Sequence, residues 1–139
     1  MKNILPVILL SVCVLAGVFS AISCLPGMQE KALIQGGVTI GPLTPVQRVG
    51  ECPTASPEVF FSRKLMIYDE SGQKLVREVY FTQIGNSTNG YYAAKVGAGT
   101  YTIDINHNGI DRAEGLPKKI TVIADETIII DVKIDTGIR

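Results

Sequence analysis

The last third of the chain alternates apolar and polar residues with a period of two. The alternation runs through 100–106 and again through 127–135. The apolar positions of these two segments are Tyr101, Ile103, Ile105, Ile128, Ile130, Val132 and Ile134. Because successive side chains of a strand leave opposite faces of a sheet, this pattern predicts two half-buried antiparallel strands.

Shorter strands are predicted upstream, where β-branched and aromatic runs are separated by glycine and polar pairs. We expect them at 37–40, 59–68, 74–82, 91–96 and 119–124. We expect tight turns at 69–72, 86–90 and 124–127. The proline-rich segment 41–57 is typical of an extended, irregular loop. No long stretch downstream of Cys24 places apolar residues at helical spacing, so the sequence predicts an all-β fold, a single antiparallel Ig-like β-sandwich of about seven strands.

The start of the chain is typical of a secretory signal peptide. One cation, Lys2, is followed by an apolar run over 4–22 and by small residues that lead to Cys24. The tail Ala21-Ile22-Ser23-Cys24 resembles the bacterial lipobox, in which the cysteine thiol is acylated and becomes the new amino terminus. We therefore expect a signal peptide over 1–23, lipid attachment at Cys24, a tether over 24–35 and the sandwich over 36–139.

Two other fates of this leader stay open. Cleavage nearby without acylation would give a secreted protein, and an uncleaved leader would give an amino-terminal anchor. The run 4–22 is long for a signal peptide, whose apolar region has about 7–15 residues, and it approaches the ~20 residues that span a hydrocarbon core. All three fates place 25–139 outside the cytoplasm. The expected location is the cell membrane, lipid-anchored and facing the periplasm or the exterior.

The charge balance narrows the range of partners. The chain carries 13 Lys and Arg residues against 13 Asp and Glu residues, and removal of Lys2 with the leader leaves 12 against 13, a net charge of −1. Nucleic-acid binding leaves a basic stripe that this sequence lacks. We expect attachment to the membrane, a protein or glycan partner at the cell surface, and no nucleic-acid partner.

The cysteines give no catalytic pattern. Cys13 would leave with the leader and Cys24 is the expected lipid site, so Cys52 is left over. If Cys24 were not acylated, a disulfide between Cys24 and Cys52 would stabilise the domain by closing a loop. A catalytic Cys52 would need a base, and the only histidine, His107, is distant in sequence. We expect no catalytic residue, no cofactor and no metal, and therefore a protein that is not an enzyme.

The segment 90–103 resembles the signature of carboxypeptidase-regulatory-like domains. It contains a turn glycine, Gly90, then the aromatic-led strand from Tyr91, and the corner Gly97-Ala98-Gly99-Thr100-Tyr101. Those domains are sandwiches of the prealbumin-like (transthyretin-like) type, with seven antiparallel strands. The hairpin around 69–72 and the closing segment 120–134 fit the same scheme. The resemblance spans about 36–139 and implies the fold of an exported prokaryotic lipoprotein domain, without an assigned reaction.

A narrower resemblance lies at the start of this region, in 36–46 followed by Glu51-Cys52-Pro53. It is similar to the opening of exported prokaryotic proteins in which a Gly-Pro-x-Cys-Pro-Val run precedes a second cysteine, and the resemblance implies that those two cysteines pair. Thr44 stands here where the first cysteine would be. The pairing is therefore lost, or Cys52 has another partner.

One loop carries oxygen side chains at the spacing of a calcium loop. Positions 1, 3, 5, 6 and 8 are Asp104, Asn106, Asn108, Gly109 and Asp111. An EF-hand loop uses oxygens at 1, 3 and 5 and glycine at 6, but its bidentate glutamate stands at 12, and here Glu114 is one place early. The alternative is that Asp104 and Asn106 form the wet face of a strand that ends in an Asn-Gly turn.

Surface aromatics are a second candidate for ligand binding. They are Phe60, Phe61, Tyr80, Tyr91 and Tyr92. The favoured function is a non-enzymatic, membrane-tethered, extracytoplasmic β-sandwich module with an adhesion, scaffold or accessory role. The alternative is a ligand-binding module for calcium or carbohydrate that uses the loop from Asp104 to Glu114 or the tyrosines. An exposed sandwich edge at the strands of Tyr80 or Lys95 would also recruit a partner strand.

Overall fold

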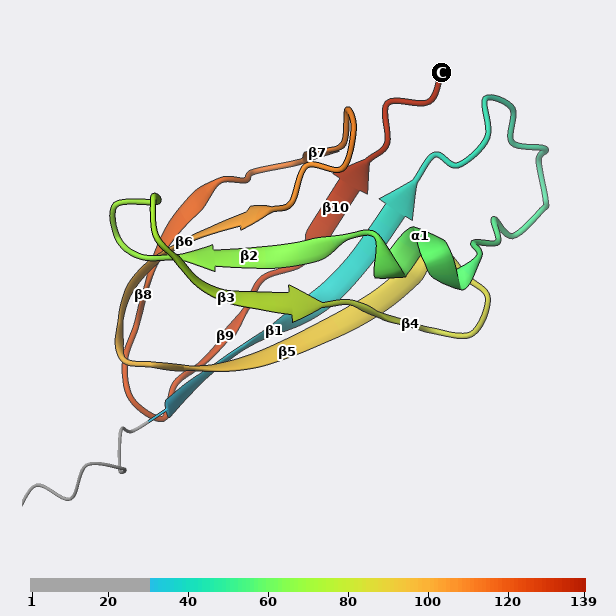
Figure 1. The fold of residues 1–139 in the computed structure, drawn as a ribbon. Helices are drawn as coiled ribbons and strands as arrows, with labels where there is room; N and C mark the ends of the chain where they lie inside the picture. The colour runs from blue at the N-terminus through green and yellow to red at the C-terminus, as the bar shows by residue number, and fades with distance from the viewer. Residues whose placement is uncertain (1–30) are drawn as a thin grey trace, which may run out of the picture.

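Two β-sheets packed face to face form the fold of residues 31–139, the part of the chain that the computed structural model describes (Figure 1). The predicted all-β sandwich is therefore confirmed. The elements are β1 Lys31–Gly41, α1 Pro57–Phe61, β2 Lys64–Tyr68, β3 Leu75–Tyr80, β4 Thr82–Gln83, β5 Asn89–Gly97, β6 Gly99–Ile105, β7 Arg112–Ala113, β8 Lys118–Val122, β9 Thr127–Ile129 and β10 Val132–Asp135. The expected signal peptide over 1–23 and the lipid site Cys24 lie outside the described residues.

The two sheets are not entirely antiparallel, because two of the strand pairs are parallel. One contains β4-β5-β1-β10-β7 with β9 also pairing to β1, and the other contains β3-β2-β6-β8. β1 pairs antiparallel with β5 but parallel with both β9 and β10. The described residues form ten strands rather than seven. Three differences account for this: the predicted strand 127–135 divides into β9 and β10, the predicted strand 74–82 divides where the chain changes sheets, and the two-residue strand β7 was not predicted.

Strand β1 begins earlier than the sequence indicated. Residues 31–35, expected to belong to the tether, pair with β5 and β9, and Ala32 and Ile34 are fully buried. The alternation of these two buried residues with the half-buried Leu33 and Gln35 continues through Gly36 and Gly37. The glycine pair indicated the start of a strand, but it lies in the middle of one.

Gly36 of β1 lies directly against the connection between β9 and β10, and this contact requires a glycine. The amide of Ile130 donates to the carbonyl of Gln35 (2.9 Å), and the amide of Gly37 donates to the Asp131 carboxylate (2.8 Å). A Cβ atom at Gly36 would overlap the carbonyl group of Ile130. Only glycine allows the backbone to approach this closely, so Gly36 permits β1 to pair with both β9 and β10.

Helix α1 replaces the start of a predicted strand over 59–68. Pro57 occupies the first turn, where its missing N–H costs nothing, and Glu58 lies at the positive end of the helix. Phe60 is buried and lies against Gly90, where a Cβ atom would overlap its ring. This single turn of helix places Phe60, three positions after the proline, in the core, and β2 starts only at Lys64.

The core lies between the two sheets. Its largest buried side chains are Ile34, Ile40, Phe60, Leu65, Ile67, Ile103, Ile105 and Ile134. Tyr92 is also buried: its ring packs edge-on against Phe81 at 5.9 Å, and its hydroxyl donates to the carbonyl of Ile130 (2.6 Å). Burial raises the pKa of Tyr92. The burial of the apolar positions predicted in 100–106 and 127–135 follows the expected alternation.

The sandwich has two distinct ends. We call the end where β1 begins at Lys31 the amino end, and the end where β1 reaches Gly41 the distal end. The turns 69–74, 97–99 and 123–126 lie at the amino end, since Gly97 pairs with Lys31 and Thr127 with Leu33. The distal end carries the loop 42–56, helix α1 and the carboxyl terminus (Figure 1).

Substitution of Gly36 tests the close approach of β1 to the β9–β10 connection. We expect Gly36→Ala to lower the free energy of unfolding by about 1–3 kcal/mol, because the added methyl group overpacks a backbone contact. The matched control is Gly41→Ala, where a Cβ atom meets nothing within 4 Å. Urea unfolding followed by circular dichroism measures both. Equal stability of the two variants would contradict the contact.

Candidate functional site

Asp111, a candidate calcium ligand, is held in a buried ion pair. Both of its carboxylate oxygens accept from Arg63, at 2.6 Å from Nε and 3.1 Å from Nη2. The Asp111 side chain is 3% exposed and the Arg63 side chain is 12% exposed. Arg63 also donates to the carbonyl of Val59 in helix α1 (2.9 Å). The pair therefore joins the loop after β6 to the segment between α1 and β2.

Two further oxygen-bearing side chains of the same loop, Asn106 and Asp104, are also engaged by the protein. Asn106 accepts from the amide of Lys64 (3.1 Å) and donates to the carbonyl of Ser62 (2.9 Å). His107 bridges the Asp104 carboxylate (3.0 Å) and the carbonyl of Asp111 (3.1 Å). The hydrogen bond to Asp104 is the main cause that raises the pKa of His107 above 6.5.

These contacts make the loop a structural clasp. Of the side chains predicted to converge on a cation, Asp104, Asn106 and Asp111 contact protein donors instead. Asn108 and Glu114 are exposed. Within residues 31–139 no group of three or more His, Cys, Asp and Glu side chains is placed to hold a metal ion. A calcium ion would have to displace Arg63 from a nearly buried carboxylate, which is costly because the arginine would lose its only charged partner there.

The aromatic residues do not form one surface. Phe60 and Tyr92 belong to the core, whereas Phe61, Tyr80 and Tyr91 are exposed. Tyr91 lies on β5 in one sheet and Tyr80 on β3 in the other, and Phe61 ends helix α1 at the distal end. The predicted aromatic platform is wrong for the set as a whole, because alternate residues of β5 point to opposite faces.

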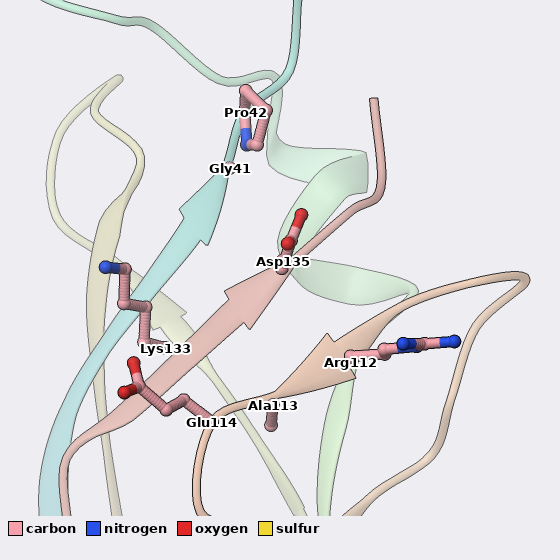
Figure 2. Close-up of a pocket in the computed structure, with 7 residues that line it drawn as sticks. All are labelled: Gly41, Pro42, Arg112, Ala113, Glu114, Lys133 and Asp135. Atoms are coloured by element: carbon pink, nitrogen blue, oxygen red, sulfur yellow. The ribbon is translucent and has the colours of Figure 1, made fainter. Parts of the chain in front are cut away.

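A surface cavity lies at the distal end, where β1, β10 and β7 meet (Figure 2). Its volume is about 590 Å³. It is lined by Gly41, Pro42, Arg112, Ala113, Glu114, Lys133 and Asp135. Figure 2 shows Asp135 between the end of β1 and β7, with Arg112 pointing away from Lys133. The wall thus combines backbone and small apolar groups with charges of both signs.

The carboxylate of Asp135 is the best-held charge of this cavity. It accepts from Arg139 (2.8 Å) and from the amide of Gly137 (2.9 Å), and these hydrogen bonds lower its pKa to about 2. The lining contains charged side chains of both signs and no histidine, cysteine, serine or threonine. The arrangement can bind a polar group.

Sequence reasoning missed this cavity because its residues come from three distant segments. The parallel pairing of Gly41 with Asp135 and the antiparallel pairing of Arg112 with Asp135 bring them together. Neither pairing leaves a local signal in the sequence. Of the predicted residues, only Glu114 lies here.

Cys52 is exposed on the loop 42–56 at the distal end. The predicted lipid site Cys24 and the leader lie outside the described residues, so neither acylation nor a disulfide to Cys52 is tested by the structure. Between residues 31 and 139, no helix is long and apolar enough to cross a membrane.

Comparisons with known proteins show a distant likeness to a solved structure. No protein-family model matches the chain. No curated protein matches it. Among solved structures, it is similar to a DUF3823 family protein from Parabacteroides merdae, with 16% sequence identity and a TM-score of 0.38. The alignment covers 75% of this chain and 45% of that one, so the chain spans less than half the length of that protein. A likeness at this level assigns neither a family nor an activity.

The clasp makes a prediction that separates a structural role from a calcium site. We expect Asp111→Asn to lower the free energy of unfolding by about 3–5 kcal/mol, because it leaves Arg63 without its buried counter-charge. Thermal unfolding in excess chelator and in excess calcium should give the same midpoint for the native protein. The matched control is Asp135→Asn, whose ion pair is exposed and should matter little. Stabilisation by calcium that Asp111→Asn abolishes would contradict the structural role.

Proposed function

We propose that this chain is a non-enzymatic β-sandwich module, tethered to a membrane through a lipid on Cys24 and facing the periplasm or the cell exterior. Its role is adhesion, scaffolding or accessory support of a surface assembly. The observation that carries the proposal is the position of Lys31. The first residue of β1 follows Cys24 after six intervening residues, 25–30, which reach at most about 20 Å when extended.

This short connection gives the tethered module a fixed polarity. A lipid on Cys24 would hold the amino end of the sandwich, with the turns 69–74, 97–99 and 123–126, close to the membrane. The distal end would then face outward with the loop 42–56, helix α1 and the cavity around Asp135. Five of the exposed large apolar side chains lie on distal segments: Val46, Val49, Phe61, Ile84 and Ile110. The distal end is therefore the surface that would meet partners.

The carboxypeptidase-regulatory-like type of sandwich is supported by one local feature. The corner 97–100 carries the chain from β5 in one sheet to β6 in the other. The hydroxyl of Tyr101 donates back to the carbonyl of Gly97 (2.8 Å) and holds this corner closed. Gly99 has φ +155°, at the limit of what side chains tolerate. These are the residues on which the resemblance rests.

The ligand-binding alternative has a narrower basis. Three of the predicted calcium ligands, Asp104, Asn106 and Asp111, are hydrogen-bonded within the clasp. The exposed tyrosines Tyr80 and Tyr91 lie on different sheets. The cavity around Asp135 remains a place for a polar ligand such as a sugar. It offers Arg112 and Lys133 as donors and Glu114 as an acceptor, each exposed.

Intact-mass spectrometry tests the tether. The protein is expressed in a host that processes lipoproteins and is extracted from the membrane fraction. We expect a mature chain that begins at Cys24 and carries a diacylglycerol mass, and we expect Cys24→Ala to lose both. The matched control is Cys52→Ala, which keeps the lipid. An uncleaved Met1, or a cleaved chain without lipid in the soluble fraction, would contradict the proposal.

A further inference from the structure

The amino-end half of the larger sheet has two open strand edges. In this half the sheet consists of β5, β1 and β9, because β10 pairs only with the distal half of β1. The pairing of β5 with β4 ends at Tyr91, and β9 pairs with β1 alone among the described strands. Among the described residues, no strand pairs with the outer edge of 93–97 on one side or of 127–129 on the other, so both edges can accept another strand.

Hydrogen bonds show which backbone groups face outward on β5. The carbonyl of Asn89 accepts from the amide of Ile84 (2.9 Å), and the carbonyl of Lys95 accepts from the guanidinium of Arg77. Both carbonyls point away from β1. Because alternate residues of a strand direct their backbone groups to the same edge, Ala93 also offers its N–H and C=O there.

The same reasoning applies to β9. The carbonyl of Glu126 accepts from the amide of Leu33 (2.8 Å), and the amide of Ile130 donates to Gln35 (2.9 Å). The backbone groups of these even-numbered residues point to β1. Those of Thr127 and Ile129 consequently point outward, to the open edge.

The two edges match each other in direction and register. β5 is antiparallel to β1 and β9 is parallel to it, so β9 of a second copy in the same orientation would run antiparallel to β5. Thr127 then faces Lys95, and Ile129 faces Ala93, with outward backbone groups on both sides. All four side chains are exposed on the same outer face. The alanine leaves room for the isoleucine, which is 68% exposed.

The charges beside these edges are also complementary. Arg77, Glu78 and Lys95 line the groove between β3 and β5, and Glu78 is paired with Lys64 (3.0 Å). Asp125 and Glu126 directly precede Thr127 on the opposite side of the sandwich. We propose that two copies of this chain associate side by side, with β9 of one copy extending the sheet of the next at β5. In the single chain, Arg77 donates to the Lys95 carbonyl, which would accept from a backbone amide of an added strand. In the assembly, the Arg77 guanidinium pairs instead with Asp125 and Glu126 of the neighbouring copy.

This contact is heterologous, because it joins two different surfaces. In a pair, one copy keeps its β9 edge open and the other keeps its β5 edge open, so association continues from copy to copy. All copies present Lys31 at the same end, which suits molecules held on one membrane. The contact itself requires only the sandwich, so it does not depend on a lipid at Cys24.

Cysteine cross-linking between two differently tagged full-length chains tests the contact in the cells that express them. Both chains carry Cys52→Ala; one also carries Lys95→Cys and the other Thr127→Cys. A facing antiparallel pair has Cα atoms about 5.5 Å apart, within the range of a disulfide. Copper phenanthroline oxidises the paired thiols. We expect a dimer that contains both tags, and little dimer that contains one tag twice.

The matched control replaces Thr127→Cys by Lys133→Cys, an exposed position on the same face but on β10. A mixed dimer no stronger than this control would overturn the proposal, as would equally strong dimers of either variant with itself. A second variant adds Asp125→Asn to the Thr127→Cys chain. Asp125 has φ +61°, which asparagine also tolerates, so the turn is kept while the charge is lost. We expect a several-fold lower yield of mixed dimer, and an unchanged yield would contradict the charge complementarity.

Discussion

The fold depends on the backbone of β1, the central strand of the larger sheet, which pairs with other strands along both of its edges. One edge pairs with β5 over nine residues, and the other is shared by β9 and β10. Its side chains Ile34, Val38 and Ile40 are almost fully buried beneath the second sheet. Gly36 makes the shared edge feasible, because the chain passes from β9 to β10 directly against its backbone. The first and last strands of the described chain thus hold each other in place, and the strands between them are connected around this pair.

Polar residues that looked chemically interesting serve this architecture. The Arg63–Asp111 pair and the Asp104–His107 contact fix the loop after β6 against helix α1 and β2. A buried ion pair contributes little net stability, but it fixes which groups must meet. What remains for interaction is the distal surface and the open edges at the amino end. These are the surfaces on which the proposed binding role depends.

Local patterns predicted much of the fold and little of the cavity. The alternation over 100–106 gave the strand β6 and its buried face correctly, because one side of that strand is solvated and the other packed. The same pattern over 127–135 predicted the buried positions but not the break between β9 and β10. The alternation of buried and exposed residues continues through Ile130 and Asp131, so it does not reveal the break. The tether predicted over 24–35 is too long. Nothing in the sequence around Gly36 and Gly37 indicates the close contact with Ile130 that places this glycine pair in the middle of a strand. The cavity at Asp135 depends on pairings of segments that lie up to about a hundred residues apart, which single-sequence patterns cannot register.

Native-state hydrogen exchange of the full chain tests the central role of β1 most directly. A strand paired on both sides should open only with global unfolding, so its amides should be among the slowest to exchange. We predict that the amides of 32–40 are protected as strongly as the β5 amides that face β1, while those of the loop 42–56 exchange quickly. Rapid exchange over 32–36, with protection beginning only at 37, would show that this segment is a tether after all and would contradict the account.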